Sequence, residues 1–235
     1  MFTKLFWRGL LGLIIIISAG GCTAIFDSKT EDSYSGAASN GPVLSFYVGD
    51  SEFTGSIDKQ IIETYKKGIT LRDLLKNSGL VVFDRNGKSI DFVSNVSLDS
   101  MLQWEIQVGG KPLGAADWDK VVAKSDHIGL VAKPKDSLQS VDSLVLYLDG
   151  ANDHPELTHS YVLPYKADSS VRSFLNKSGY VQLSEDSTSI LSVNKYTPLT
   201  DEVWKIKVNG KLLMENGMDM KLHPQDEVEV VLTSR

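Results

Sequence analysis

Cysteine is almost absent from this chain: its 235 residues include only Cys22. A single thiol excludes an intramolecular disulfide and leaves the role of that residue to be explained. Long basic runs are absent too, since Lys66–Lys67 is the longest and the formal net charge is −6 at pH 7. Nucleic-acid binding depends on clustered lysine and arginine, so the sequence argues against a nucleic-acid partner.

Familiar catalytic motifs are missing as well. The sequence contains no Gly-x-Ser-x-Gly, no P-loop and no His-Glu-x-x-His. His127 and His223 do not align with each other in the repeat described below, and neither has a neighbouring Ser or Cys pattern. We therefore predict a protein that is not an enzyme, with no cofactor and no metal site.

The N-terminus carries the features of an export signal. Lys4 and Arg8 are positive, and an apolar stretch over residues 10–18 follows them. Only 13 residues separate Arg8 from Cys22, fewer than the roughly 20 that a transmembrane helix needs. We therefore predict a signal peptide over residues 1–21.

The end of this segment, Ala19-Gly20-Gly21-Cys22, resembles the lipobox of bacterial lipoproteins. In that family the cysteine is lipidated on its thiol, becomes the first residue after cleavage and is acylated. The resemblance implies that Cys22 anchors the chain in the cell membrane on its extracytoplasmic face, because more than one acyl chain gives stable anchoring. The alternative is an uncleaved signal anchor. Residues 22–42, rich in Ser, Gly, Ala, Asp and Glu, predict a flexible tether.

The rest of the chain is an internal repeat. Residues 43–133 align with residues 143–233 at a constant offset of 100, and about 21 of these 91 pairs are identical. The identities fall on turn glycines and alternating apolar positions, as expected for a duplicated domain. We predict two domains, over residues 43–133 and 143–235, joined by a linker at 134–142.

The repeat is clearest at one strand. Trp104-Glu105-Ile106-Gln107-Val108 alternates apolar and polar residues and returns as Trp204-Lys205-Ile206-Lys207-Val208. Period-two alternation predicts a strand with one buried face. The pairs that follow, Gly109-Gly110 and Asn209-Gly210, favour a tight type I′ hairpin turn.

Each copy has the same predicted order of elements. In the first copy we expect strands over 44–48 and 60–66, a helix from Thr70 to Gly79, the Trp strand, and a last strand over 128–131. Thr70 and Asp73 suit a helix N-terminus, and the apolar stripe on this helix is formed by Leu71, Leu74 and Leu75. This order predicts an α+β fold of β-grasp-like units.

The same order, with the Trp-x-Ile-x-Val-[Gly/Asn]-Gly-Lys segment and an Asp before the last strand, resembles the transcobalamin C-terminal-like β-grasp family. That family is related to the soluble ligand-binding β-grasp domains. The chain departs from the family pattern at Gly109, where Asn is usual, and at Ser125-Asp126 and Gln225-Asp226, where Gly-Asp is usual. The resemblance implies a bacterial surface protein; cobalamin contact belongs to one branch of the family and is not carried over to particular residues of this chain.

The candidate ligand residues each have a structural alternative. Trp104 and Trp204 can stack on a ligand or pack in the core, and their apolar register favours the core. Lys111 and Lys211 follow the hairpin turns. They can bind an anionic ligand, or they can simply be solvated charges at exposed turns. Trp118 is a further candidate, as one of several aromatics of an interdomain cleft with Tyr161, Tyr180 and Tyr196.

One loop concentrates metal-type donors. Residues 153–159 hold His154, His159 and two carboxylates, a composition that can bind Zn²⁺. The spacing matches no compact zinc motif, and the first copy has no histidine there, so a polar hairpin loop is the favoured interpretation.

Two functions from different classes remain open. The first is a lipid-anchored binding protein that captures a small molecule or cofactor, with uptake as its purpose. The second is an interaction or adhesion module of the cell envelope that binds protein or wall polymer. We favour the first.

Overall fold

The structure is a computed structural model that describes residues 40–53, 58–136 and 141–235. The predicted signal peptide, Cys22 and the tether up to residue 39 lie outside these residues. Within them the chain is mostly β-strand with three α-helices, which confirms the α+β class. None of the helices in this part of the chain is both long and apolar enough to span a membrane.

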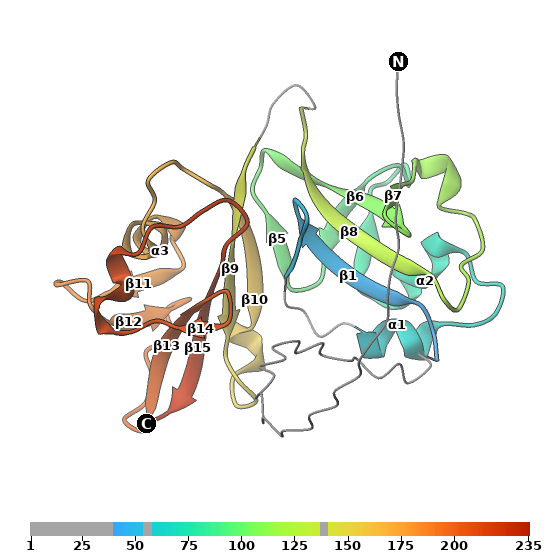
Figure 1. The fold of residues 1–235 in the computed structure, drawn as a ribbon. Helices are drawn as coiled ribbons and strands as arrows, with labels where there is room; N and C mark the ends of the chain where they lie inside the picture. The colour runs from blue at the N-terminus through green and yellow to red at the C-terminus, as the bar shows by residue number, and fades with distance from the viewer. Residues whose placement is uncertain (1–39, 54–57, 137–140) are drawn as a thin grey trace, which may run out of the picture. The chain divides into compact units, whose positions relative to one another are not determined.

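Copy one, which we define as residues 43–133, contains a five-stranded mixed sheet (Figure 1). Its strands, in spatial order, are β2 (Ser51–Phe53), β1 (Val43–Val48), β8 (His127–Pro134), β6 (Leu102–Val108) and β7 (Lys111–Pro112). Strand β1 runs parallel to β8, and β8 runs antiparallel to β6. This register places Phe46, Leu130 and Ile106 side by side, and each of them is almost fully buried.

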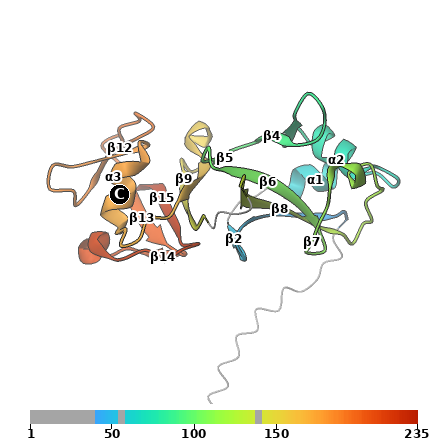
Figure 2. The same ribbon diagram turned by 90° about the horizontal axis from the view of Figure 1, so that it is seen from above.

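The helices of copy one are α1 (Asp58–Thr64) and α2 (Leu71–Asn77) (Figure 2). The strand predicted over 60–66 is therefore wrong in copy one. Ile61 is fully buried, and its carbonyl accepts a hydrogen bond from the amide of Tyr65, one helical turn later. Copy two, residues 143–235, has Pro164 in place of Thr64 and forms β10 (His159–Pro164) there. Proline has no amide hydrogen and disfavours a helix interior, so the two copies differ at this element.

The predicted capped helix is confirmed in both copies. Thr70 accepts a hydrogen bond from the amide of Asp73 at 3.1 Å, and Leu71, Leu74 and Leu75 are buried. In copy two, α3 (Val171–Ser178) has a full capping box between Ser170 and Ser173. The residues matching the stripe, Val171, Phe174 and Leu175, are buried as well.

The predicted hairpin turns are also confirmed. Gly109 and Gly110 have φ of 57° and 73°, and Asn209 and Gly210 have φ of 50° and 74°. Two successive residues with positive φ are the signature of a type I′ turn, which glycine and asparagine tolerate best.

The sheet of copy two continues into copy one. Its strands, in spatial order, are β14 (Lys211–Leu212), β13 (Glu202–Val208), β15 (Glu227–Ser234), β9 (Ser143–Asp149), β10, and then β5 (Val96–Leu98), β4 (Ile90–Val93) and β3 (Val81–Phe83) of copy one. Strand β10 is parallel to β5, with Tyr161 opposite Ser97. The remaining elements are β11 (Val181–Leu183), β12 (Ile190–Val193) and the 3-10 helices η1 (Ala115–Asp117), η2 (Pro155–Leu157) and η3 (Glu215–Asp219).

Two clusters of buried apolar side chains form the core, one for each copy. The first lies between the five-stranded sheet and the helices of copy one, and it also takes in Val145 and Val162 from β9 and β10. The second lies within copy two and includes Trp204. The domain boundaries themselves stay a prediction.

Candidate functional site

Trp104 lines an open groove in copy one. The cavity has a volume of about 470 Å³ and lies where β4 and β5 meet the start of β6. Trp104 is half-buried; its inner side packs 5.8 Å from the ring of Phe46, and its outer side borders the groove. Phe92, about half exposed, also borders it. We call this cavity the Trp104 groove.

Polar groups complete the rim of the Trp104 groove. Lys135 contributes a cationic side chain, Gln103 an amide, and Ser97 and Asp99 further polar groups. An aromatic surface surrounded by a few polar groups is typical of small-molecule sites. The arrangement can therefore stack a flat apolar surface and hold polar substituents at its edge.

Trp204, the counterpart in copy two, is covered. Only 6% of its surface is exposed, and the ring of Tyr196 meets it edge-on with centroids 6.3 Å apart. Its indole Nε1 has no hydrogen-bond partner among the described residues. The structure thus separates the two tryptophans that the sequence treats alike: one borders a cavity and the other is core.

Two substitutions between the copies account for this difference. Val96 and Leu102 of copy one are replaced by Tyr196 and Glu202 in copy two. Both apolar residues are buried, whereas the polar pair is joined by a hydrogen bond from the Tyr196 hydroxyl to the Glu202 carboxylate at 2.7 Å. The tyrosine ring then lies over Trp204, where copy one stays open.

His154 joins this pair to form a polar cluster. Its Nε2 lies 2.9 Å from the Tyr196 hydroxyl and 3.4 Å from the Glu202 carboxylate, and its Nδ1 lies 3.2 Å from Glu156. The Tyr196–Glu202 hydrogen bond lowers the pKa of Glu202 and raises the pKa of Tyr196 to about 12. We call His154, Tyr196 and Glu202 the His154 cluster.

The loop between β9 and β10 holds His154 in place. Gly150 allows the chain to fold back so closely that a Cβ at this position would overlap the carbonyl oxygen of His154. The amide of His154 donates to the carbonyl of Gly150 at 3.1 Å, and Pro155 begins η2. The loop is therefore a defined turn that points one imidazole toward β13.

The other histidine of the loop lies elsewhere. His159 Nε2 is 2.9 Å from the hydroxyl of Ser97, and its ring packs at a tilt of 43° against Tyr161 with centroids 4.4 Å apart. Burial lowers the pKa of His159. No three His, Cys, Asp or Glu side chains in the described ranges are grouped so as to hold a metal ion.

Trp118, a predicted ligand residue, is part of the core. It is 5% exposed, its Nε1 donates to the Leu113 carbonyl at 3.3 Å, and its ring lies 5.3 Å from that of Phe83. The guanidinium of Arg72 lies 5.4 Å from both ring centroids, which is cation–π range.

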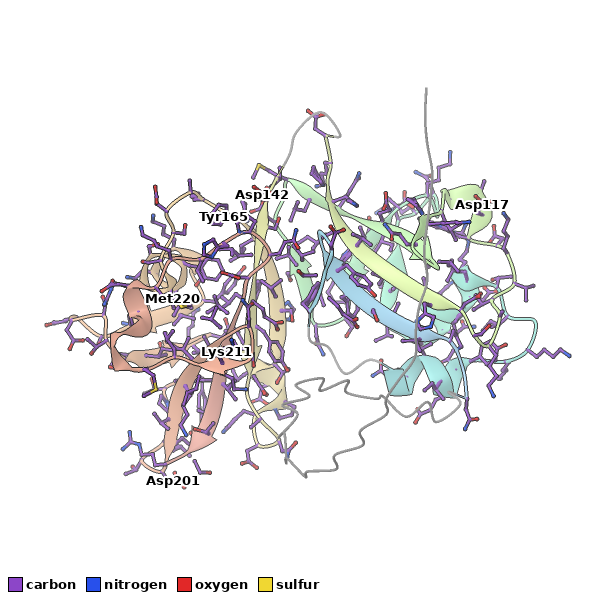
Figure 3. All side chains as sticks on the ribbon, in the orientation of Figure 1. Asp117, Asp142, Tyr165, Asp201, Lys211 and Met220 are labelled. Atoms are coloured by element: carbon purple, nitrogen blue, oxygen red, sulfur yellow. The ribbon has the colours of Figure 1, made fainter. Side chains whose placement is uncertain are left out.

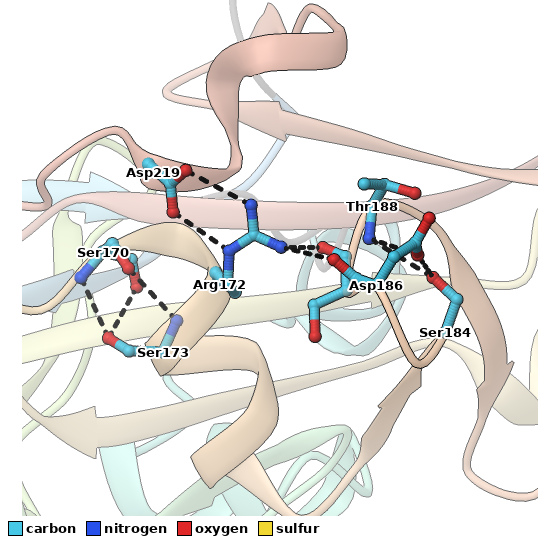
Figure 4. A network of polar contacts seen from close by, with 8 residues as sticks. Ser170, Arg172, Ser173, Ser184, Asp186, Thr188 and Asp219 are labelled. Carbon is cyan, nitrogen blue, oxygen red and sulfur yellow. Dashed lines mark hydrogen bonds and ion pairs between the residues drawn. The ribbon is translucent and has the colours of Figure 1, made fainter.

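An arginine–aspartate pair recurs in both copies and was missed at the sequence level. Arg72 Nε contacts Asp119 at 2.7 Å, and Arg172 Nε contacts Asp219 at 3.0 Å. In Figure 4 the guanidinium of Arg172 also reaches the backbone carbonyl of Asp186 on the β11–β12 loop. The signal was present, because all four residues are identical pairs at the 100-residue offset.

The lysines after the hairpin turns lie at the surface. Lys111 and Lys211 are exposed, and Figure 3 labels Lys211 at the start of β14. The paired aspartates stabilise turns: Asp126 accepts from the amide of Ala123 at 2.8 Å, and Asp226 accepts from the amide of His223 at 2.7 Å. Both aspartates therefore have a structural role at their turns.

The structure places the four aromatics considered for an interdomain cleft in separate surroundings. A hollow of about 430 Å³ does draw residues from both copies, including Glu52, Gln225 and Glu229. Trp118, Tyr161, Tyr180 and Tyr196 are not among the residues that line it. Instead Tyr161 and Tyr180 stack on each other at 3.6 Å, and Tyr196 belongs to the His154 cluster.

No protein-family model and no curated protein matches the chain. Among the similar solved structures is a protein of Ruminococcus gnavus named a "putative metal binding protein". The match has 15% sequence identity and a TM-score of 0.32, and it covers 40% of this chain and 98% of that one. It assigns no family.

Proposed function

We propose that the chain is a lipid-anchored, extracytoplasmic binding protein that captures a small molecule in the Trp104 groove. The observation that carries the proposal is the contrast between the copies. Copy one keeps its strand tryptophan at the border of a cavity, whereas copy two covers the same residue with Tyr196. A merely structural tryptophan would be expected in the same environment in both copies.

The lining of the Trp104 groove suggests the class of ligand. Trp104 and Phe92 offer aromatic faces, and Lys135 with Gln103 offers hydrogen-bond donors at the rim. A ring-shaped molecule with hydroxyl or carboxylate substituents suits this combination, since aromatic faces bind flat apolar surfaces and a few polar groups fix orientation. Sugars and cofactors, cobalamin among them, belong to this class.

The wider setting is part of the same proposal. Lipidation at Cys22 would hold the protein at the membrane surface, and the tether would let its two domains extend away from the membrane. The mixed sheet with a capped helix, found once in each copy, supports two tandem β-grasp-like domains. Neither catalysis nor nucleic-acid binding is part of the proposed role.

Tryptophan fluorescence tests the proposal directly. In the full chain with Trp7→Phe, three tryptophans remain; two are 5–6% exposed and Trp104 alone borders the groove. A panel of cobalamins, other cofactors, sugars and wall fragments is titrated while emission and the thermal midpoint are followed. A ligand at 100 times its Kd should stabilise the fold by about 2.7 kcal/mol.

Matched variants locate the response. Trp104→Ala should abolish both the change in emission and the thermal shift, whereas Lys111→Ala, an exposed change in the same copy outside the groove, should preserve the shift. A thermal shift that persists in the Trp104→Ala variant would place the ligand elsewhere and refute the groove.

A second candidate function, a protein-binding module of the envelope, has its own supporting observation. Val82 and Phe92 face each other across β3 and β4 and are 52% and 49% exposed. Copy two has Gln182 and Ser192 at these positions, joined by a hydrogen bond. Strand β3 is also the edge of its sheet, where a partner strand can add.

The copy-two residues provide the test of this second function. A Val82→Gln, Phe92→Ser chain should lose crosslinks to envelope proteins in intact cells if β3 is an interaction edge. Unchanged crosslinking would remove the observation that favours this candidate.

A further inference from the structure

The His154 cluster brings three different donor atoms to one point of copy two. The Tyr196 hydroxyl lies 2.7 Å from Glu202 Oε2 and 2.9 Å from His154 Nε2, and His154 Nε2 lies 3.4 Å from Glu202 Oε1. Each pair of side chains is therefore in contact. The third donor is a phenol, which sets this cluster apart from sites built from His, Cys, Asp and Glu alone.

These separations suit one face of a six-coordinate metal ion. Ligands bound at about 2.0–2.2 Å and at right angles to each other lie roughly 2.8–3.1 Å apart. The observed separations of 2.7–3.4 Å bracket this range. The facial triad of non-haem iron sites also offers three donors from one side and leaves positions open, although it has two imidazoles and one carboxylate where this cluster has one imidazole and two oxygens.

The surroundings of His154 complete the pattern of a metal site. Glu156 lies 3.2 Å from Nδ1, the ring nitrogen that points away from Tyr196 and Glu202. Histidine ligands commonly donate their second N–H to a carboxylate, which fixes the tautomer and directs the other nitrogen at the metal. Gly150 and Pro155 hold the backbone that carries this imidazole.

We propose that the His154 cluster is a binding site for a trivalent transition-metal ion, for which Fe³⁺ is the best match. When the ion binds, the Tyr196 phenol releases its proton to solvent and the phenolate oxygen replaces that proton with a bond to the metal. Phenolate, the Glu202 carboxylate and the Glu156 carboxylate then supply three negative charges opposite three positive ones. Phenolate and carboxylate are hard oxygen donors, which favour a small, highly charged cation.

The repeat does not place a second copy of this site in copy one. Copy one has Thr54, Val96 and Leu102 at the three matching positions, and none of these is a donor of the same kind. The cluster is accessible to an incoming ion, since the side chains of His154 and Glu202 are 22% and 15% exposed. At the start of β13, Arg235 Nε donates a hydrogen bond to the backbone carbonyl of Glu202 at 3.0 Å, so this contact leaves the Glu202 carboxylate to the cluster.

The experiment uses the full chain in detergent, without a histidine tag and stripped of metal by a chelator. It is then exposed to Fe³⁺ supplied as its nitrilotriacetate complex, and passed through a desalting column. We expect one iron per chain and a visible charge-transfer band from tyrosinate to Fe³⁺. Zn²⁺, which gives no such band, and Cu²⁺ are tested in parallel.

Three variants define the ligands. Tyr196→Phe keeps the aromatic ring against Trp204 but removes the oxygen, so the visible band should vanish. Glu202→Leu introduces the copy-one residue and should weaken iron binding at least tenfold. Glu156→Gln replaces the partner of Nδ1 and removes one negative charge beside the site, and it should weaken binding about 10- to 100-fold. His223→Gln, an exposed histidine with 79% of its side chain accessible, serves as the matched control and should leave binding unchanged.

The outcomes separate a metal site from a structural hydrogen-bond cluster. Circular dichroism melts show which variants remain folded, and Glu156→Gln keeps the three donors in place if another variant does not fold. Retention of no iron by the unmodified chain would overturn the proposal. So would a visible band that survives Tyr196→Phe, or tight binding of Zn²⁺ or Cu²⁺ without Fe³⁺.

Discussion

Arg172 donates two hydrogen bonds to the carboxylate of Asp219: Nε lies 3.0 Å from Oδ1 and Nη2 lies 3.3 Å from Oδ2. The pair links α3 to the end of η3, and Arg72 and Asp119 make the same contact in copy one. In both copies the guanidinium also donates a hydrogen bond to a backbone carbonyl of the hairpin loop that follows the helix. One side chain thus joins a helix, a loop and a 3-10 turn.

Removing this arginine should destabilise copy one. Arg72→Leu loses the hydrogen bonds to Asp119 and Gly87 and the contact with two aromatic rings, at about 1.5–3 kcal/mol. Asp119→Asn should have a smaller effect, because the carboxylate is 67% exposed and its ion pair is screened by solvent. Chemical denaturation measures both. Arg85→Leu, an exposed change on the same hairpin, should stay within about 0.5 kcal/mol, and an equal loss there would contradict the argument.

The same pairs predict the response to acid. The hydrogen bond from Arg72 lowers the pKa of Asp119, and the one from Arg172 lowers the pKa of Asp219. Because the folded pKa values lie below the unfolded value of 3.8, the stabilisation is present above that pH and is lost as pH falls through the folded values. Unfolding free energies measured from pH 5 to pH 2 should fall less steeply in an Asp119→Asn, Asp219→Asn chain. Parallel curves would show that the pairs do not contribute.

His159 predicts a second pH effect at milder acidity. Burial lowers its pKa from 6.5, because the folded state disfavours the charged ring. Stability is therefore complete above pH 6.5 and declines as pH falls through the lowered folded pKa. His159→Gln should flatten the thermal midpoint between pH 7 and pH 5. The exposed His223→Gln should leave the slope as it is, and a slope unchanged in both variants would rule out His159 as its source.

Adding a single methyl group at Gly150 should strongly reduce the stability of the fold. A Cβ there would overlap the carbonyl oxygen of His154, which belongs to the backbone and cannot rotate away. Gly150→Ala should lower the free energy of unfolding by more than about 1 kcal/mol. Gly114→Ala is the control, since its φ is −73° and a Cβ would meet no atom within 4 Å. Equal denaturation midpoints for the two variants would refute the close approach.

Several parts of the fold could be predicted from local signals alone. The caps of α2 and α3, their buried stripes and the two type I′ turns depend on residues a few positions apart, so each is readable in a short window. The 100-residue repeat gave each prediction twice. The error at residues 60–66 has a tertiary cause: Ile61 packs on helix α1 against the core, a choice that its apolar character alone does not decide.

The candidate sites depended on contacts that no short window contains. His154 and Tyr196 are 42 positions apart, and they meet only because the β9–β10 loop and the segment before β13 converge above Trp204. The sequence by itself determined the duplicated plan, the capped helices and the tryptophan strands, because periodicity and backbone preference act over a few residues. Only the tertiary structure decided which tryptophan stays open and which donors meet, because packing joins residues that the chain keeps far apart.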